Sequence, residues 1–168
     1  MKYFIKEWVI PFLIALVIVL LLNIFVFQIM TVPTGSMIDT IMEGDRLFVN
    51  KIFNIEDVKR GDILVFKSHE LKINLVKRLI GLPGETVDIK SNGDVYINGA
   101  KLDEPYVIKS TGIEQTFNIP EDSYFFLGDN RPISKDARYW VNPYINKKDI
   151  KGEAIFKVYP FNRIGKLE

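Results

Sequence analysis

An apolar run near the start of the chain limits how the remaining residues can fold. Between positions 8 and 30 only Asn23 and Gln28 are clearly polar, and no side chain is charged. As a helix this run would measure roughly 34 Å, enough to cross a hydrocarbon core of about 30 Å. A chain of 168 residues could not cover such a helix on every side. We therefore predict a transmembrane helix over residues 8–30.

A cleavable secretory signal is the alternative explanation of this run. The apolar core of a signal usually spans about 7–15 residues and ends in an Ala-x-Ala-like site. Here the run is longer, and the following QIMTVP has no such site, which favours an uncleaved anchor. Lys2 and Lys6 outnumber Glu7, so residues 1–7 are predicted to be a cytoplasmic tail. Residues 31–168 should then lie outside the cytoplasmic membrane as one domain.

Composition excludes several kinds of site. The chain has no cysteine, so disulfides, thiolate metal sites and a cysteine nucleophile are excluded. A net charge of +1 gives no reason to expect nucleic acid as a partner. The single histidine, His69, lies in a polar stretch typical of a surface loop, and one imidazole is too little for a zinc site. We expect neither a metal nor a cofactor.

After Thr31 the apolar pattern changes from continuous to alternating. Short segments rich in Val, Ile, Phe and Tyr are separated by turns such as SNG at 91–93 and NG at 98–99. The expected strands are 46–51, 62–66, 75–80, 86–90, 94–97, 124–127 and 154–159. Only residues 141–151 and the surroundings of Ser36 suggest a helical turn. The predicted fold class is mainly β, with an all-β domain on a single transmembrane helix.

Ser36 is a candidate nucleophile because of its place in the chain. It lies six residues past the apolar run, so an extended chain holds it within about 20 Å of the membrane surface. Pro33 and Gly35 suit a tight backbone path that presents the hydroxyl. The same residues would also form an ordinary juxtamembrane turn, and this segment alone does not separate the two interpretations.

Lys77 is a candidate general base, since burial among apolar groups can lower the pKa of a lysine. It lies within the apolar strand pattern LVKRLI, where a solvated lysine is poorly explained. Strand alternation puts Lys77 and Arg78 on opposite faces, so at least one must face an apolar or paired environment. A lysine that protects an exposed strand edge remains the alternative. Further on, residues 127–138 hold two aspartates and two arginines that could form fixed ion pairs.

Taken together, four segments resemble the type I signal peptidases, which use a Ser–Lys dyad. They occur in the family's order along nearly the whole chain: PTGSM at 33–37, GDRLFVNK at 44–51, KRLIGLPG at 77–84, and GDNR at 128–131 with Ser134, Asp136 and Arg138. The short connections between the segments resemble the compact Gram-positive form. Two positions depart from the family pattern: Asp39 stands where proline is usual, and Ala137 where serine is usual.

The resemblance implies a role for each matching residue. Ser36 would attack the scissile carbonyl and Lys77 would take its proton. The oxyanion would be held by Thr34 and the Ser36 N–H, and Ser134 would orient the lysine amine. Structural ion pairs would join Arg78 to Asp129 and Arg138 to Asp136. Shallow substrate pockets would be lined by Val32, Met37, Leu75 and Val76.

The implied function is removal of signal peptides from secretory preproteins at the lipid bilayer, with cleavage after small residues of the Ala-x-Ala type. Two other interpretations stay open: a Ser–Lys protease that cuts itself or a regulator, and an anchored β domain that binds exported proteins without catalysis. The sequence does not separate a housekeeping enzyme from one with a few dedicated substrates.

Overall fold

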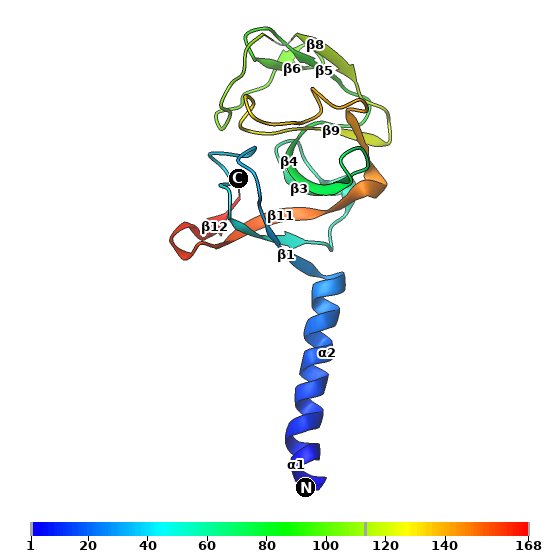
Figure 1. The fold of residues 1–168 in the computed structure, drawn as a ribbon. Coiled ribbons are helices and arrows are strands. Elements are labelled where there is room, and N and C mark those ends of the chain that lie inside the picture. The colour runs from blue at the N-terminus through cyan, green and yellow to red at the C-terminus, as the bar shows by residue number, and fades with distance from the viewer. Residues whose placement is uncertain (1, 113, 168) are drawn as a thin grey trace.

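The N-terminal apolar run forms one long helix that stands clear of the rest of the molecule (Figure 1). The computed structural model describes residues 2–112 and 114–167. The helical path consists of α1 (Lys2–Phe4), a π-helical turn η1 (Ile5–Val9) and α2 (Ile10–Phe25). Pro11 lacks an N–H, and the helix widens just before it, where the Ile10 N–H bonds the Ile5 carbonyl. The segment Ile5–Phe25 is long and apolar enough to cross a membrane, and none of it is buried.

The helix ends at Phe25, before the end predicted at residue 30, so the predicted boundary needs correction. Phe27–Thr31 instead forms strand β1, which pairs antiparallel with β2 (Arg46–Asn50). The Lys51 ammonium donates to the carbonyl oxygens of Asn23 (3.0 Å) and Ile24 (3.1 Å) at the helix end. A cation that binds the last carbonyls stabilises a helix C-terminus. Lys51 and the β1–β2 ladder together fix where the helix stops.

An eight-stranded antiparallel sheet carries most of the domain. Its strand order is β1-β2-β11-β3-β4-β9-β10, and β12 pairs with β11. The further bounds are β3 Ile63–Ser68, β4 Ile73–Gly81, β9 Ser123–Leu127, β10 Tyr144–Asn146, β11 Ile150–Tyr159 and β12 Gly165–Lys166. Three 3₁₀ turns lie between strands: η2 Ile55–Asp57, η3 Lys147–Asp149 and η4 Phe161–Arg163.

A second, four-stranded antiparallel sheet lies at the end of the domain farthest from the helix (Figure 1). Its order is β7-β6-β5-β8, with bounds β5 Thr86–Ile89, β6 Val95–Ile97, β7 Ala100–Lys101 and β8 Gln115–Asn118. The β6–β7 hairpin turns through Asn98 and Gly99, both at positive φ (50° and 83°). This is the two-residue hairpin turn for which Asn-Gly is preferred.

Two apolar clusters fill the domain and determine which face of each strand is buried. The larger packs residues of both sheets around Phe66, Leu79, Phe125 and Phe126. The smaller lies under β2, β3 and β4, and its members are Val32, Met37, Ile41, Leu47, Val49, Ile63, Val65, Val76 and Ala154. The prediction of a mainly β domain behind a single apolar helix is confirmed. The sequence analysis did not anticipate β1, β7, β8, β10 and β12, which have at most five residues each.

Candidate active site

Ser36 and Lys77 meet although 41 positions separate them. Ser36 lies in the turn-rich segment between β1 and β2, and Lys77 lies on β4. A short hydrogen bond joins the Lys77 Nζ to the Ser36 Oγ. Both residues are buried, with only 7% and 3% of their surfaces exposed. A hydroxyl and an amine in direct contact at a buried site are what a nucleophile–base pair requires.

Burial changes the acidity of Lys77. The pKa of Lys77 falls from 10.5 to about 8, mainly because of desolvation and with a smaller contribution from Arg138. Asp136 and Asp129 oppose this shift through their negative charges, but desolvation is the larger effect. Near neutral pH a useful fraction of Lys77 is therefore neutral and able to accept a proton.

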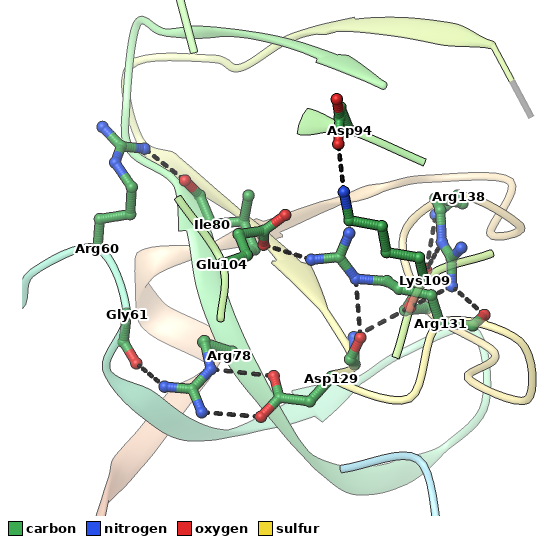
Figure 2. A network of polar contacts seen from close by, with 12 residues as sticks. Arg60, Gly61, Arg78, Ile80, Asp94, Glu104, Lys109, Asp129, Arg131 and Arg138 are labelled. Carbon is green, nitrogen blue, oxygen red and sulfur yellow. Dashed lines mark hydrogen bonds and ion pairs between the residues drawn. The ribbon is translucent and has the colours of Figure 1, made fainter. Parts of the chain in front are cut away.

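A bidentate ion pair between Arg78 and Asp129 lies next to the pair formed by Ser36 and Lys77. The Arg78 Nε and Nη2 donate to the two carboxylate oxygens of Asp129 at 2.9 and 2.8 Å (Figure 2). The Thr40 hydroxyl, from the segment that carries Ser36, also donates to Asp129, at 2.6 Å. The pair therefore ties β4 and the β9–β10 connection to the nucleophile segment. A buried pair with these extra hydrogen bonds holds its geometry far better than an exposed one.

A second buried pair fixes the connection between β9 and β10. The Arg138 Nε and Nη2 donate to Asp136 at 2.8 and 2.9 Å, and Nη2 also donates to the Arg131 carbonyl at 2.7 Å. The Asp136 carboxylate in turn accepts from the Gly128 N–H at 3.0 Å. This pair closes residues 128–138 into a rigid loop beside Lys77. Ala137, where the resemblance leads one to expect serine, is buried in the larger apolar cluster.

Ser134 does not make the hydrogen bond that the resemblance implies. Its Oγ is buried and has no hydrogen-bond partner among the described residues, so it does not bond the Lys77 amine. The hydroxyl lies instead against Gly128, where an added Cβ would stand 2.2 Å from it. Lys77 is oriented in this structure by Ser36 itself.

Of the other predicted residues, Thr34 lies beside the nucleophile, and the four predicted pocket residues do not all lie together. The Thr34 Oγ1 is 3.2 Å from the Ser36 Oγ, a suitable place for an oxyanion donor. Val32, Met37 and Val76 lie together in the smaller apolar cluster and are almost fully buried. Leu75 is separate from them, because it points to the opposite face of β4 and packs on the larger cluster.

Two positions that hold the nucleophile were missed by the sequence analysis. The Asn130 N–H donates to the Ser36 carbonyl at 3.1 Å, and its side-chain amide donates to the Gly35 carbonyl at 3.2 Å. Gly128 lies so close that an added Cβ would stand 2.5 Å from the Ser36 carbonyl oxygen. GDNR was noted as one of the four family segments and for its charges, but no role was assigned to Gly128 or Asn130. A glycine or an asparagine between charged residues carries no periodic signal of such contacts.

The described residues contain no group of three or more His, Cys, Asp or Glu side chains that could hold a metal ion. His69 lies on the turn between β3 and β4, where its Nε2 is 2.8 Å from an Asp149 carboxylate oxygen. It is exposed and has no part in the pair formed by Ser36 and Lys77.

Comparison with known proteins identifies the family to which this chain belongs. The family model described as signal peptidase, peptidase S26, matches residues 5–159. Signal peptidase I of Bacillus licheniformis is 40% identical over 96% of this chain and 92% of its own length. Signal peptidase I T of Bacillus subtilis (strain 168) is also 40% identical, over 94% and 87%. A crystal structure of a signal peptidase I from Enterococcus faecalis V583 is 36% identical, with a TM-score of 0.51; the match covers 60% of this chain and 98% of that one.

Gly128→Ala should lower the free energy of unfolding by about 1–3 kcal/mol, since the added Cβ would overlap the Ser36 carbonyl and Ser134. Urea unfolding in detergent measures the change. Gly165→Ala is the matched control, because a Cβ there meets nothing within 4 Å, and it should change stability by less than about 0.5 kcal/mol. Equal stability of the two variants would contradict the close contact at Gly128.

Proposed function

The chain belongs to the signal peptidase I family (peptidase S26) and is a peptidase that removes signal peptides, and we propose that it does so with a Ser36–Lys77 dyad at the outer face of the membrane. The observation that carries the dyad is the buried hydrogen bond between the Ser36 hydroxyl and the Lys77 amine. No other described lysine is buried.

The proposed reaction begins with neutral Lys77. Its amine takes the proton of Ser36 as the Oγ attacks the scissile carbonyl carbon, and then gives that proton to the leaving amine of the mature protein. Lys77 next activates a water molecule that hydrolyses the acyl-enzyme and releases the signal peptide. The Thr34 hydroxyl and the Ser36 N–H are proposed to stabilise the oxyanion; loss of one such donor typically costs about 100- to 1,000-fold in rate.

An unpaired strand edge suggests how the substrate is bound. On one edge β4 pairs with β3 from Ile73 to Arg78, whereas on the other its described pairing with β9 begins only at Arg78. Residues 73–77 thus offer free backbone groups directly before Lys77. We propose that the segment preceding the cleavage site binds there as an added strand, a common mode of peptide recognition.

The proposed preference for Ala-x-Ala substrates follows from what surrounds the dyad. Val32, Met37 and Val76 are packed in the core and leave little room for a large side chain. A bulky residue before the cut would need these side chains to move, which is costly in a close-packed interior. Alanine and other small residues need no such movement.

The proposed topology puts residues 1–7 in the cytoplasm and the β domain outside. It rests on the apolar helix Ile5–Phe25 and on the basic residues Lys2 and Lys6 at its start. The apolar segment of a preprotein occupies the same bilayer, so enzyme and substrate would meet in two dimensions at a raised effective concentration.

Ser36→Ala and Lys77→Met should each abolish cleavage of a detergent-solubilised preprotein with an Ala-x-Ala site. Without Ser36 there is no nucleophile, and without the amine of Lys77 no group beside Ser36 accepts its proton. Gel analysis and mass spectrometry of the products measure cleavage and its position. Lys135→Met is the control for loss of a lysine and should remain active. Persisting activity in either dyad variant would contradict the assignment; a wild type inactive against several preproteins would favour a binding domain.

The rate should rise with pH up to the pKa of Lys77. Because protonated Lys77 cannot act as a base, kcat/KM should fall about tenfold per pH unit below roughly pH 8 and level off above it. Initial rates between pH 6 and pH 10 measure this acid limb of the pH–rate profile. A limb centred near pH 6.5, well below the pKa of Lys77, would contradict Lys77 as the base.

Single cysteines should report the topology cleanly, because the chain has none of its own. A cysteine at Asn92, in the hairpin turn between β5 and β6, should react in intact cells with a thiol reagent that does not cross membranes. A cysteine at Lys2 should react only after the membrane is opened. The reverse pattern would overturn the proposed orientation.

A further inference from the structure

A segment of the second sheet reaches across to the catalytic loops of the first. Residues 102–108, which we name the strap, follow β7 and lead toward β8. At its start the Leu102 N–H bonds the Val95 carbonyl of β6 at 2.8 Å. At its end Ile108 forms a parallel bridge with Asn130, in which its N–H bonds the Asp129 carbonyl and its carbonyl accepts from the Arg131 N–H, both at 3.0 Å. The strap is thus fixed at both ends.

The middle of the strap covers the ion pair behind the dyad. The Tyr106 ring lies over the Arg78 guanidinium, with its centroid 3.8 Å from the Arg78 Cζ. Arg78 is at the same time bound to Asp129 and to the Gly61 carbonyl (Figure 2). Tyr106 and Pro105 also line a cavity of about 430 Å³ together with Asp39 and Thr40 of the nucleophile segment. The ring therefore closes one side of the Arg78–Asp129 pair.

A third buried ion pair joins the strap to the 128–131 segment. The Arg131 Nη2 donates to Glu104 (Figure 2). The Arg131 Nε donates to the Gly128 carbonyl at 3.0 Å. Only 6% of the Glu104 side chain and 3% of the Arg131 side chain are exposed. Gly128 is the residue that abuts both Ser36 and Ser134, so Arg131 connects Glu104 to the wall of the nucleophile site.

A gain in stability does not by itself explain the buried Glu104–Arg131 pair. Desolvation raises the pKa of Glu104, although Arg131 opposes the shift, which shows that burial of the carboxylate is costly. Buried pairs of this kind are often matched or exceeded in stability by apolar residues of similar volume. Such a pair instead fixes the relative position of the two segments that it joins, here the strap and the 128–131 segment.

We propose that the strap is a positioning element of the active site, in which Tyr106 and Glu104 hold Arg78 and the 128–131 segment so that Lys77 stays aligned with Ser36. Arg78 follows Lys77 directly on β4, so a shift of Arg78 moves the backbone that carries the base. The charged and hydroxyl groups that face Lys77 are Ser36 of the nucleophile segment and Asp129, Asp136 and Arg138 of the β9–β10 connection. Three of these four lie on the connection that the strap holds.

The test rests on the proposed peptidase reaction and uses the full chain in detergent. Tyr106→Ala removes the ring, whereas Tyr106→Phe keeps it and serves as the conservative variant. Glu104→Gln removes one charge of the buried pair. Glu85→Gln is the matched control, because it breaks the ion pair with Arg60 (2.6 Å) outside the strap. Thermal unfolding of every variant is measured first, so that rates are compared at a temperature at which all variants are folded.

We expect Tyr106→Ala and Glu104→Gln to lower kcat on the order of tenfold while KM stays within about twofold, since misalignment affects the chemical step more than binding. In Tyr106→Ala the acid limb of the pH profile should also move upward, because a displaced Arg78 neutralises Asp129 less well, and the charge of Asp129 raises the pKa of Lys77. Tyr106→Phe and Glu85→Gln should retain the wild-type kcat and pH profile. A wild-type kcat in both strap variants would overturn the proposal. So would an equal loss of kcat in Glu85→Gln at the same loss of thermal stability.

A titration of the lysine amine separates this inference from the proposed function. Carbon-13 NMR of labelled lysine, with the Lys77 signal assigned from Lys77→Met, measures its pKa without any substrate. We expect that pKa to rise in Tyr106→Ala and to stay unchanged in Tyr106→Phe, even if the wild type were to cleave no preprotein. An unchanged Lys77 pKa in Tyr106→Ala would contradict a role of the strap at the dyad.

Discussion

The removal of the Lys77 amine from water is the constraint on which the rest of the site depends. Desolvation brings its pKa down to about 8, and several charges must lie close by without reversing that shift. Asp129 and Asp136 would favour the charged amine if they were unpaired, but Arg78 and Arg138 each bind one of them through two hydrogen bonds. The arginine–carboxylate pairs thus supply rigidity beside the base while limiting the negative charge that it meets.

Much of the fold was predictable because its signals are periodic. The apolar run, the alternating strands around Val65 and Val76, and the Asn98-Gly99 turn each follow from local chemistry. The end of the helix was not predictable in this way, since Phe27–Thr31 is apolar enough to continue it and stops only because β2 and Lys51 bind there. Pairing between distant segments decides such boundaries, and a single sequence does not display it.

Most residues of the candidate site were predictable from the sequence, but several of the contacts that hold them in place were not. Ser36, Lys77 and the two arginine–carboxylate pairs were expected from four segments in a known order. Ser134 was expected to bond the lysine, and its hydroxyl lies against Gly128 instead. Glu104 and Tyr106 were missed altogether, because a glutamate and a tyrosine in a polar connection give no sign that they bind Arg131 and Arg78 far along the chain.

The junction between helix and domain has a mechanical consequence. The chain passes from α2 into β1 with only Val26 between them, and Lys51 bonds both the last carbonyls of the helix and, through its N–H, the Val26 carbonyl. The five residues of β1 span roughly 17 Å of paired strand before the nucleophile segment begins. If the helix spans the bilayer as proposed, this short, hydrogen-bonded junction sets the distance between the membrane surface and the hydroxyl of Ser36. Under the proposed topology, the peptide bond presented to Ser36 would be the one that lies at this distance from the bilayer.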